Sequence, residues 1–301
     1  MAYGAPERLD EVEAYYTDIR GGSPPSPALL DELTGRYRAI GGGSPLSRIV
    51  ARQCDALAAE LARRGRPARV YAGMKHISPF IKETILRMAG DGVERAVAIA
   101  LAPQHSTFNV QTYGAAIERA TSALGPRAPR FTTVGSWHDQ PRFIDALAAA
   151  TSEALDRCAD RASAHVFFTA HSLPRRIASG GDPYAREVAA TAALVAERVG
   201  LTRCDVAFQS AGRTSDEWLG PELRSEIRRV AAAGAREVVV CPVGFVADHL
   251  EVLYDVDIEA RAVARELGLR LERARAMNDD PVFIAGLADV ALAGFDVEVP
   301  A

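Results

Sequence analysis

The sequence lacks the patterns that mark several large classes of protein. Its four cysteines are scattered and form no C-x-x-C pair, so they are interpreted as buried thiols in a reducing compartment, not as a disulfide frame or zinc site. The chain does not open with a basic stretch followed by an apolar one, and no apolar run approaches the length of a membrane span. We therefore expect a cytoplasmic protein without a membrane span. The net charge of −4, with no basic run, gives no reason to expect nucleic acid as a partner.

Segments rich in glycine, proline and serine are also few. Residues 21–27 are expected to form a surface loop. Residues 41–45 (GGGSP) resemble a phosphate-binding loop only superficially, because they lack the Lys-Ser/Thr ending and the G-x-G-x-x-G spacing. We interpret them as a tight turn before a helix that starts at Leu46, and we do not expect nucleotide binding.

Most of the chain consists of apolar runs that alternate with amphipathic segments. Strands are expected at residues 70–73, 96–101, 131–134, 165–170, 206–209, 238–241 and 269–271. Helices are expected at residues 8–20, 46–64, 79–89, 111–123, 142–158, 183–199, 221–233, 248–267 and 281–293. This βαβα order predicts an α/β fold of parallel sheets with helices on both faces. Two sheets of about four strands fit better than one of eight, because residues 135–141 interrupt the pattern.

Two segments at the ends of apolar runs carry the candidate chemistry. His171 stands where the run 165–170 ends. Glu251, Asp255 and Glu259 are spaced four apart and would form a line of acids along one helix. Such a row costs stability unless a cation lies beside it. The alternative is a solvated acidic face, but ligands bind where parallel strands end, so we favour a functional ridge.

The histidines differ in what surrounds them in the sequence. A lone histidine is more often structural than catalytic, and this interpretation is given to His105, His138 and His165. His171 differs because Glu251 is available from another strand end, and such a pair can hold a divalent metal and accept protons. His249 precedes Glu251 by two residues, so on a helix it should point away from that carboxylate and orient the turn.

Short motifs along nearly the whole chain resemble those of the ferrochelatases, the enzymes that insert Fe²⁺ into a porphyrin at the end of haem biosynthesis. Each motif alone is weak, but together and in order they leave little room for chance. They are residues 2–6 (AYGAP), 16–20 (YTDIR), 36–42, 44–46 (SPL), 73–76 (GMKH), 170–174 (AHSLP), 209–214 (QSAGRT) and 244–259.

The resemblance implies the chelatase fold, in which two Rossmann-like domains enclose a porphyrin cleft. The domains are expected at residues 1–134 and 135–278, with a C-terminal helix at 279–301 that packs back on the first. Tyr3 and the GMKH motif are similar to those of Gram-positive bacteria and actinobacteria, whose enzymes act on coproporphyrin III. The implied activity is that of a lyase, a metal chelatase that makes Fe-coproporphyrin (coprohaem).

The resemblance also assigns roles to the candidate residues. His171 and Glu251 are the implied catalytic pair and the inner metal ligands. Tyr3 is implied to be catalytic as well, as a weak oxygen contact to the metal from the opposite face of the macrocycle. Asp255 and Glu259 extend the metal site outward, as a track for hydrated Fe²⁺ or as a site for Mg²⁺.

Cations are expected to meet the propionates of the substrate. The candidate substrate-binding residues are Arg20, Arg36, Ser44, Lys75 and His76. For Arg20 and Arg36 the alternative is ordinary charge on a surface helix. No cofactor is required, because Fe²⁺ is itself a substrate. The expected partners are a porphyrin and Fe²⁺, a monomer is expected, and transient docking to a downstream haem-pathway enzyme is left open.

Three features depart from the family pattern. The tail after Asp280 lacks the cysteines that hold a [2Fe–2S] cluster in some actinobacterial relatives, so no cluster is expected. Ala5 stands where the family usually has threonine. The usual apolar strand before Tyr3 is missing, from which we expect the natural protein to begin upstream of Met1.

Other functions remain as alternatives. They are a protoporphyrin IX ferrochelatase, a chelatase of the same fold for another tetrapyrrole, and a non-catalytic porphyrin or haem carrier. The motif match over the whole length disfavours a chelatase for another tetrapyrrole. The presence of both His171 and Glu251 disfavours a carrier.

Overall fold

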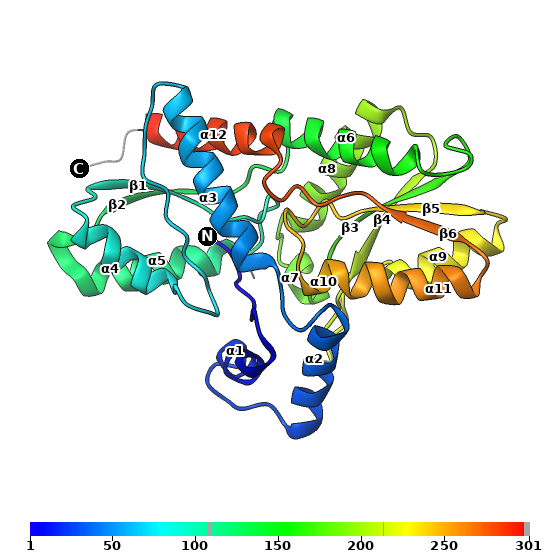
Figure 1. The fold of residues 1–301 in the computed structure, drawn as a ribbon, viewed down its shortest axis with the longest axis horizontal. Helices are drawn as coiled ribbons and strands as arrows, with labels where there is room; N and C mark the ends of the chain where they lie inside the picture. Colours follow the sequence, from blue (N-terminus) through cyan, green and yellow to red (C-terminus); the bar gives the residue numbers. More distant parts are fainter. Residues whose placement is uncertain (108–109, 213, 298–301) are drawn as a thin grey trace.

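The computed structural model describes residues 1–107, 110–212 and 214–297, and it has two parallel β-sheets flanked by helices (Figure 1). The first sheet pairs β1 (Arg95–Ile99) with β2 (Arg130–Val134). The second has the order β4-β3-β5-β6. Its strands are β3 (His165–His171), β4 (Cys204–Gln209), β5 (Glu237–Cys241) and β6 (Arg270–Arg273). The strands of both sheets pair in parallel, which confirms the predicted α/β class.

The helices follow most of the predicted amphipathic segments. Their bounds are η1 (Leu9–Glu11), α1 (Val12–Ile19), α3 (Leu46–Arg63), α4 (Ile81–Gly90), α5 (Val110–Leu124), η2 (Gly125–Arg127), α6 (Pro141–Leu155), α8 (Tyr184–Val199), α9 (Leu223–Ala232), α10 (Leu250–Leu253), the π-helix η3 (Asp255–Ala260), α11 (Arg261–Glu266) and α12 (Pro281–Asp296). The sequence did not predict α2 (Pro27–Ala39) or α7 (Arg175–Ser179). Ser26 caps α2 and Pro27 opens it, which is a helix-start signal, but its Pro- and Ser-rich surroundings favoured a loop.

The second sheet is covered by helices on both faces. Phe168 packs in a cluster with α6 and α8, whereas its neighbour Phe167 packs in a cluster with α9 and α11. Successive side chains of a strand point to opposite faces, so an unbroken apolar run is what a strand buried on both sides requires. This sheet therefore forms a rigid platform for whatever follows its strands.

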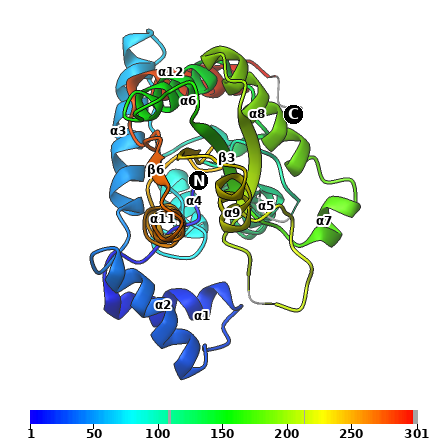
Figure 2. The same cartoon turned by 90° about the vertical axis from the view of Figure 1, so that its right-hand side faces the viewer.

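The two sheet units are bridged by α12 and flanked by a separate helical hairpin. α12 contacts α3, β1 and β2 on one side and α6 on the other. Figures 1 and 2 show the α1–α2 hairpin below both sheets, apart from the main body. In the sequence, the strands of the first sheet end at Val134 and those of the second begin at His165. The predicted domain boundary between residues 134 and 135 stays a prediction. The last four residues of the predicted helix 279–301 lie outside the described residues. None of the helices that the structure describes has the length and apolar character needed to cross a bilayer.

The first sheet has two strands, so the prediction of about four strands is wrong for it and right for the second sheet. Residues 70–73, expected to be a strand, join no ladder. Met1 and Ala2 lie between this segment and β1 and form backbone hydrogen bonds to both sides. The Met1 carbonyl accepts from the Leu101 N–H at 2.8 Å. Ala2 donates to the Gly73 carbonyl and accepts from the Lys75 N–H, both at 3.0 Å. A strand needs a partner along its whole edge, and here only two residues supply one.

An apolar cavity of about 490 Å³ adjoins Met1, lined by residues 67–73 and 95–99 among others. The Met1 α-amino group donates to the Ile99 carbonyl at 2.6 Å, and burial lowers its pKa to about 6. The expected strand upstream of Met1 stays a prediction. We expect a chain extended by a few apolar residues before Met1 to melt at a higher temperature than the present chain, because the extension would fill the cavity and pair both edges. Equal melting temperatures would contradict this.

Candidate active site

Polar side chains gather where β3 and β4 end. His171, the last residue of β3, pairs in register with Gln209, the last residue of β4. The Gln209 side chain donates from Nε2 to the backbone carbonyl of Glu251 at 2.7 Å. This bond ties the segment after β5 to the same edge of the sheet, so the structure brings His171 and Glu251 together.

Glu251 lies between two histidines. Its Oε1 is 3.4 Å from His171 Nε2, and its Oε2 is 3.5 Å from His249 Nε2. Burial alone would lower the pKa of His171, but the Glu251 carboxylate and the Ser172 carbonyl raise it to about 9. Burial would raise the pKa of Glu251, but the two histidines hold it well below its usual range. At neutral pH, the shifts correspond to an imidazolium on His171 and a carboxylate on Glu251, which form an ion pair.

The contact of His249 with Glu251 corrects the prediction that this histidine points away. That prediction assumed a regular helix from residue 248. In the structure His249 is the extended residue before α10, with φ −160° and ψ −176°. Its Nδ1 lies 3.0 Å from the Ala247 carbonyl, so Nδ1 donates there and Nε2 is left to face Glu251.

The acidic ridge runs along α10 and the π-helix η3 instead of one regular helix. In an α-helix a spacing of four residues overshoots the turn of about 3.6, so side chains at that spacing drift around the axis. The π-helix has wider turns, seen here in the 2.9 Å bond from the Glu259 N–H to the Tyr254 carbonyl, five residues back. This wider turn offsets part of the drift between Asp255 and Glu259.

Partners lie beside the outer acids of the ridge. The Ser210 hydroxyl donates to Asp255, and Arg36 of α2 lies 3.8 Å from the same carboxylate. Arg224 of α9 lies 3.1 Å from Glu259. Burial raises the pKa of Asp255 to about 6, against the Ser210 hydrogen bond and with the help of the Glu251 charge. The cations that such a row of acids requires are thus supplied by other helices.

Sequence reasoning missed the contacts of Ser210 and Arg224. The polar run that begins at Gln209 marked the loop after β4 but did not say what it touches. Arg224 carried no signal, because an arginine on an amphipathic helix is ordinary. Arg213, in the same motif as Ser210, lies outside the described residues.

Gly244 lets the turn after β5 lie against the end of β3. A Cβ at this position would be 2.6 Å from Ala170 Cβ and 2.9 Å from Ala170 Cα. The Gly244 N–H also donates to the Thr169 carbonyl at 3.0 Å. A side chain here would push the backbone away from the residues just before His171, so glycine is required for this close approach.

Tyr3, Lys75 and His76 form a second group near the N-terminus. The Tyr3 ring centroid is 4.4 Å from that of His76 and 5.4 Å from the Lys75 ammonium. His76 Nδ1 lies 2.7 Å from Asp18. Burial, together with the charges of Glu251 and Asp18, raises the pKa of Tyr3, so its phenol is neutral. The influence of Glu251 places Tyr3 within electrostatic reach of the His171–Glu251 pair.

The other predicted substrate-binding residues differ in their exposure. Arg36 stacks over Tyr254 at 5.1 Å and faces the ridge. Arg20 is exposed at the end of α1 and donates to the Ser23 carbonyl at 3.2 Å. Ser44 is fully buried, and its hydroxyl accepts from the Leu46 N–H at 3.2 Å. This placement does not fit the predicted contact of Ser44 with a substrate, because its hydroxyl serves the start of α3.

The four predicted metal ligands form a row and not a cage. Across the part of the chain that the structure describes, no three His, Cys, Asp or Glu side chains converge closely enough to enclose a metal ion. Mg²⁺ demands near-octahedral oxygen geometry, and both outer acids already face an arginine. The residues as placed therefore do not fit a resident Mg²⁺.

Comparison with known proteins assigns the chain to a family. A family model described as Ferrochelatase matches residues 1–294. A protein of Deinococcus radiodurans named Ferrochelatase is 44% identical over 294 residues, which cover 96% of this chain and 93% of the relative. A protein of a Geobacillus species named Coproporphyrin III ferrochelatase is 42% identical over 297 residues, which cover 97% and 95%. The solved structure of SirB from Bacillus subtilis with Fe³⁺ shares the fold, with a TM-score of 0.56 at 14% identity over 81% of this chain and 89% of that chain. These findings confirm the resemblance seen in the sequence: the chain belongs to the ferrochelatase family.

Proposed function

We propose that this protein inserts Fe²⁺ into coproporphyrin III, with release of the two pyrrole N–H protons. The observation that carries the proposal is the close pair of His171 and Glu251, whose side chains lie 3.4 Å apart at the end of β3. An imidazole and a carboxylate side by side provide both a ligand for Fe²⁺ and acceptors for protons. The name of the Geobacillus relative supports coproporphyrin III as the porphyrin.

The resting charge of the pair sets the order of events. His171 already holds a proton, so it cannot accept one from a pyrrole. We infer that an arriving Fe²⁺ displaces this proton to solvent and is held by the neutral imidazole. As the nitrogens of the porphyrin bind Fe²⁺, the two pyrrole N–H protons pass to His171 and Glu251. The neutral Tyr3 phenol contacts the metal from the opposite face of the ring.

The outer acids are proposed to bring the ion to the pair. Asp255 and Glu259 continue the line from Glu251, and carboxylates attract a hydrated divalent cation while leaving its waters in place. Their neighbours Arg36 and Arg224 lie 3.8 Å and 3.1 Å away, so each acid is balanced until the ion arrives. No resident metal or Fe–S cluster takes part in this proposal.

Anaerobic mixing with Fe²⁺ and one porphyrin at a time, followed by visible absorption, tests the function. We expect turnover with coproporphyrin III and slower turnover with protoporphyrin IX. Equal turnover with the two porphyrins would refute the preference for coproporphyrin III, but the protein would still be a ferrochelatase. Porphyrin binding without metal insertion would indicate a carrier, and insertion of Co²⁺ or Ni²⁺ but not Fe²⁺ would indicate another chelatase.

Arg36→Leu should reduce the preference for coproporphyrin III. We propose that Arg36, with Arg20, Lys75 and His76, meets the propionates, of which coproporphyrin III has four and protoporphyrin IX fewer. Loss of one charge-assisted contact should weaken the more acidic porphyrin several-fold and the other less. Steady-state competition between the two porphyrins measures this. The matched control is Arg38→Leu, which removes an exposed arginine from the same helix; an equal effect of both variants would argue against a specific contact.

A further inference from the structure

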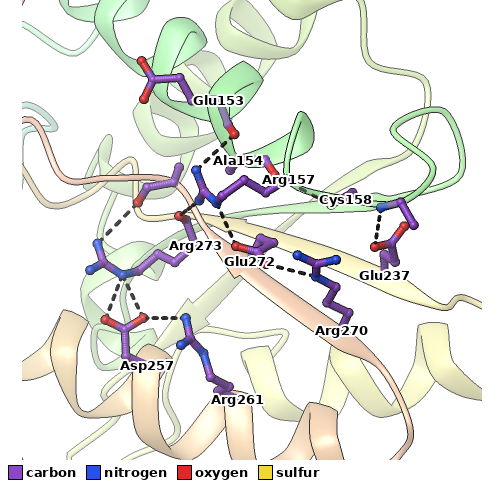
Figure 3. A network of polar contacts seen from close by, with 12 residues as sticks. Glu153, Ala154, Arg157, Cys158, Glu237, Asp257, Arg261, Arg270, Glu272 and Arg273 are labelled. Atoms are coloured by element: carbon purple, nitrogen blue, oxygen red, sulfur yellow. Dashed lines mark hydrogen bonds and ion pairs between the residues drawn. The ribbon is translucent and has the colours of Figure 1, made fainter.

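Arg273, the last residue of β6, contacts the segment of the acidic ridge at two points. Its Nε lies 2.9 Å and 3.0 Å from the two carboxylate oxygens of Asp257. Its Nη1 lies 3.1 Å from Asp248 Oδ1. The Arg273 side chain is only 14% exposed and both acids are 22% exposed, so these contacts are shielded from water. Figure 3 shows Arg273 reaching from the strand to Asp257 in the helix below it.

The two acids bracket the residues of the proposed reaction. Asp248 immediately precedes His249 and the ridge, whereas Asp257 lies in η3 between Asp255 and Glu259. Side chains two apart on a helix do not face the same way, so Arg273 grips the segment from the side away from the ridge. The Arg273 Nε–H donates to both oxygens of Asp257, whereas the contact of Nη1 with Asp248 is an ion pair without a hydrogen bond. One guanidinium thus attracts both carboxylates from a fixed position.

Arg273 is itself fixed to the sheet that carries His171. In register, Arg273 pairs with Val240 of β5, and β5 pairs with β3. Arg157, two residues after α6, donates to the Arg273 carbonyl at 2.8 Å, a contact also drawn in Figure 3. The strand that bears His171 and the arginine that holds the Glu251 segment are therefore parts of one rigid sheet.

We propose that Arg273 is a positioning residue for the His171–Glu251 pair, because it clamps Asp248 and Asp257 and so fixes the Glu251 segment relative to β3. Gln209 and Asn278 assist from either side: Gln209 holds the Glu251 carbonyl at 2.7 Å, and Asn278 donates to Asp248 at 2.9 Å. Neither crosses from the sheet to the π-helix. The consequence for iron insertion rests on the proposed function, whereas the consequence for the ridge segment does not.

Arg273→Met keeps an unbranched apolar side chain and removes the guanidinium that contacts Asp248 and Asp257. We expect kcat for iron insertion to fall about 10-fold or more, since small misplacements of reacting groups carry large costs, and the porphyrin KM to change by less than about threefold. Hydrogen exchange followed by mass spectrometry should show faster exchange over residues 249–260 and unchanged exchange in β3 and β5. The exchange measurement needs no porphyrin, so it tests the clamp even if the chain proves to act on another substrate.

Three further variants separate positioning from simple stabilisation. Arg270→Met, the matched control, removes the 53% exposed arginine at the other end of β6, which pairs with Glu272, and should leave kcat and exchange unchanged. Arg273→Met leaves Asp257 with Arg261 as its ion-pair partner, at 3.4 Å. Arg273→Met with Asp257→Asn removes the charge of this acid as well; it should recover melting temperature but not kcat. Arg273→Lys keeps the charge without the Nε–H that bonds to both oxygens of Asp257, and should fold with kcat lowered about threefold or more.

Parental kcat and parental hydrogen exchange in Arg273→Met would overturn the proposal. If that variant fails to fold, parental values in Arg273→Lys would serve instead. Full recovery of kcat in the double variant would also overturn it, because the loss would then come from the remaining charge of Asp257 and not from the position of Glu251.

Discussion

His171→Ala should lower the rate of iron insertion by about 100-fold or more while porphyrin binding persists. The variant removes the imidazole that is proposed to hold Fe²⁺ and then to accept a pyrrole proton. It leaves Glu251 and the side chains that are proposed to meet the propionates in place, so the macrocycle should still enter the site. Anaerobic turnover with Fe²⁺ and coproporphyrin III measures the first effect, and a fluorescence titration of the porphyrin measures the second.

The matched control for this variant lies on the same strand. His165 begins β3 and pairs with Asp205 at 3.0 Å, at the edge of the sheet opposite to His171. His165→Ala should keep turnover close to that of the parent protein. Near-normal turnover in His171→Ala would sink the assignment of the catalytic pair, as would equal losses in both variants.

The second sheet and its edge could be predicted because their signals are local. The run from Val166 to Ala170 is apolar except for Thr169 and is buried throughout, as burial on both faces of the sheet demands. The polar residues that follow parallel strands must collect at one edge, so His171 could be linked to Glu251 without coordinates. The family motifs added the chemistry to a geometry that the βαβα order had already suggested.

The features that could not be predicted depend on distant partners. Residues 70–73 have the composition of a strand, but a strand exists only where a neighbour completes its ladder. The ridge was expected on a regular helix, because residue spacing alone does not show where five-residue bonds replace four-residue ones. For the same reason, the sequence did not predict the extended backbone at His249 or the contact of His249 with Glu251 that this backbone allows.

The arginines show a further limit of pattern reading. The ridge was expected to need cations, yet nothing in the sequence distinguished Arg224 and Arg273 from the other arginines, and Arg36 was singled out for the propionates of the substrate and not for the ridge. Their roles follow from tertiary contacts between α2, α9, β6 and the segment after β5. A charge pattern states that a partner is required, and only the fold says which residue it is.

Glu251→Gln should both slow iron insertion, by about 100-fold or more, and move its pH dependence to lower pH. Glutamine keeps the shape of the side chain but removes the carboxylate that raises the pKa of His171 to about 9. Burial, which lowers the pKa of a histidine, remains in the variant. His171 should therefore lose its proton at a lower pH in Glu251→Gln than in the parent protein.

The direction of the pH effect follows from which form of His171 is active. A protonated imidazole can neither hold Fe²⁺ nor accept a pyrrole proton, so at limiting Fe²⁺ the parent rate should keep rising as pH approaches about 9. In Glu251→Gln the smaller residual rate should reach its plateau earlier. Rate profiles from about pH 6 to about pH 9 measure the shift in the pH dependence of turnover. Histidine ring NMR of the same two proteins measures the pKa of His171 itself. Profiles that rise over the same range in both proteins would mean that Glu251 does not hold the proton on His171, and the proposed order of events, in which Fe²⁺ must first displace that proton, would then be wrong.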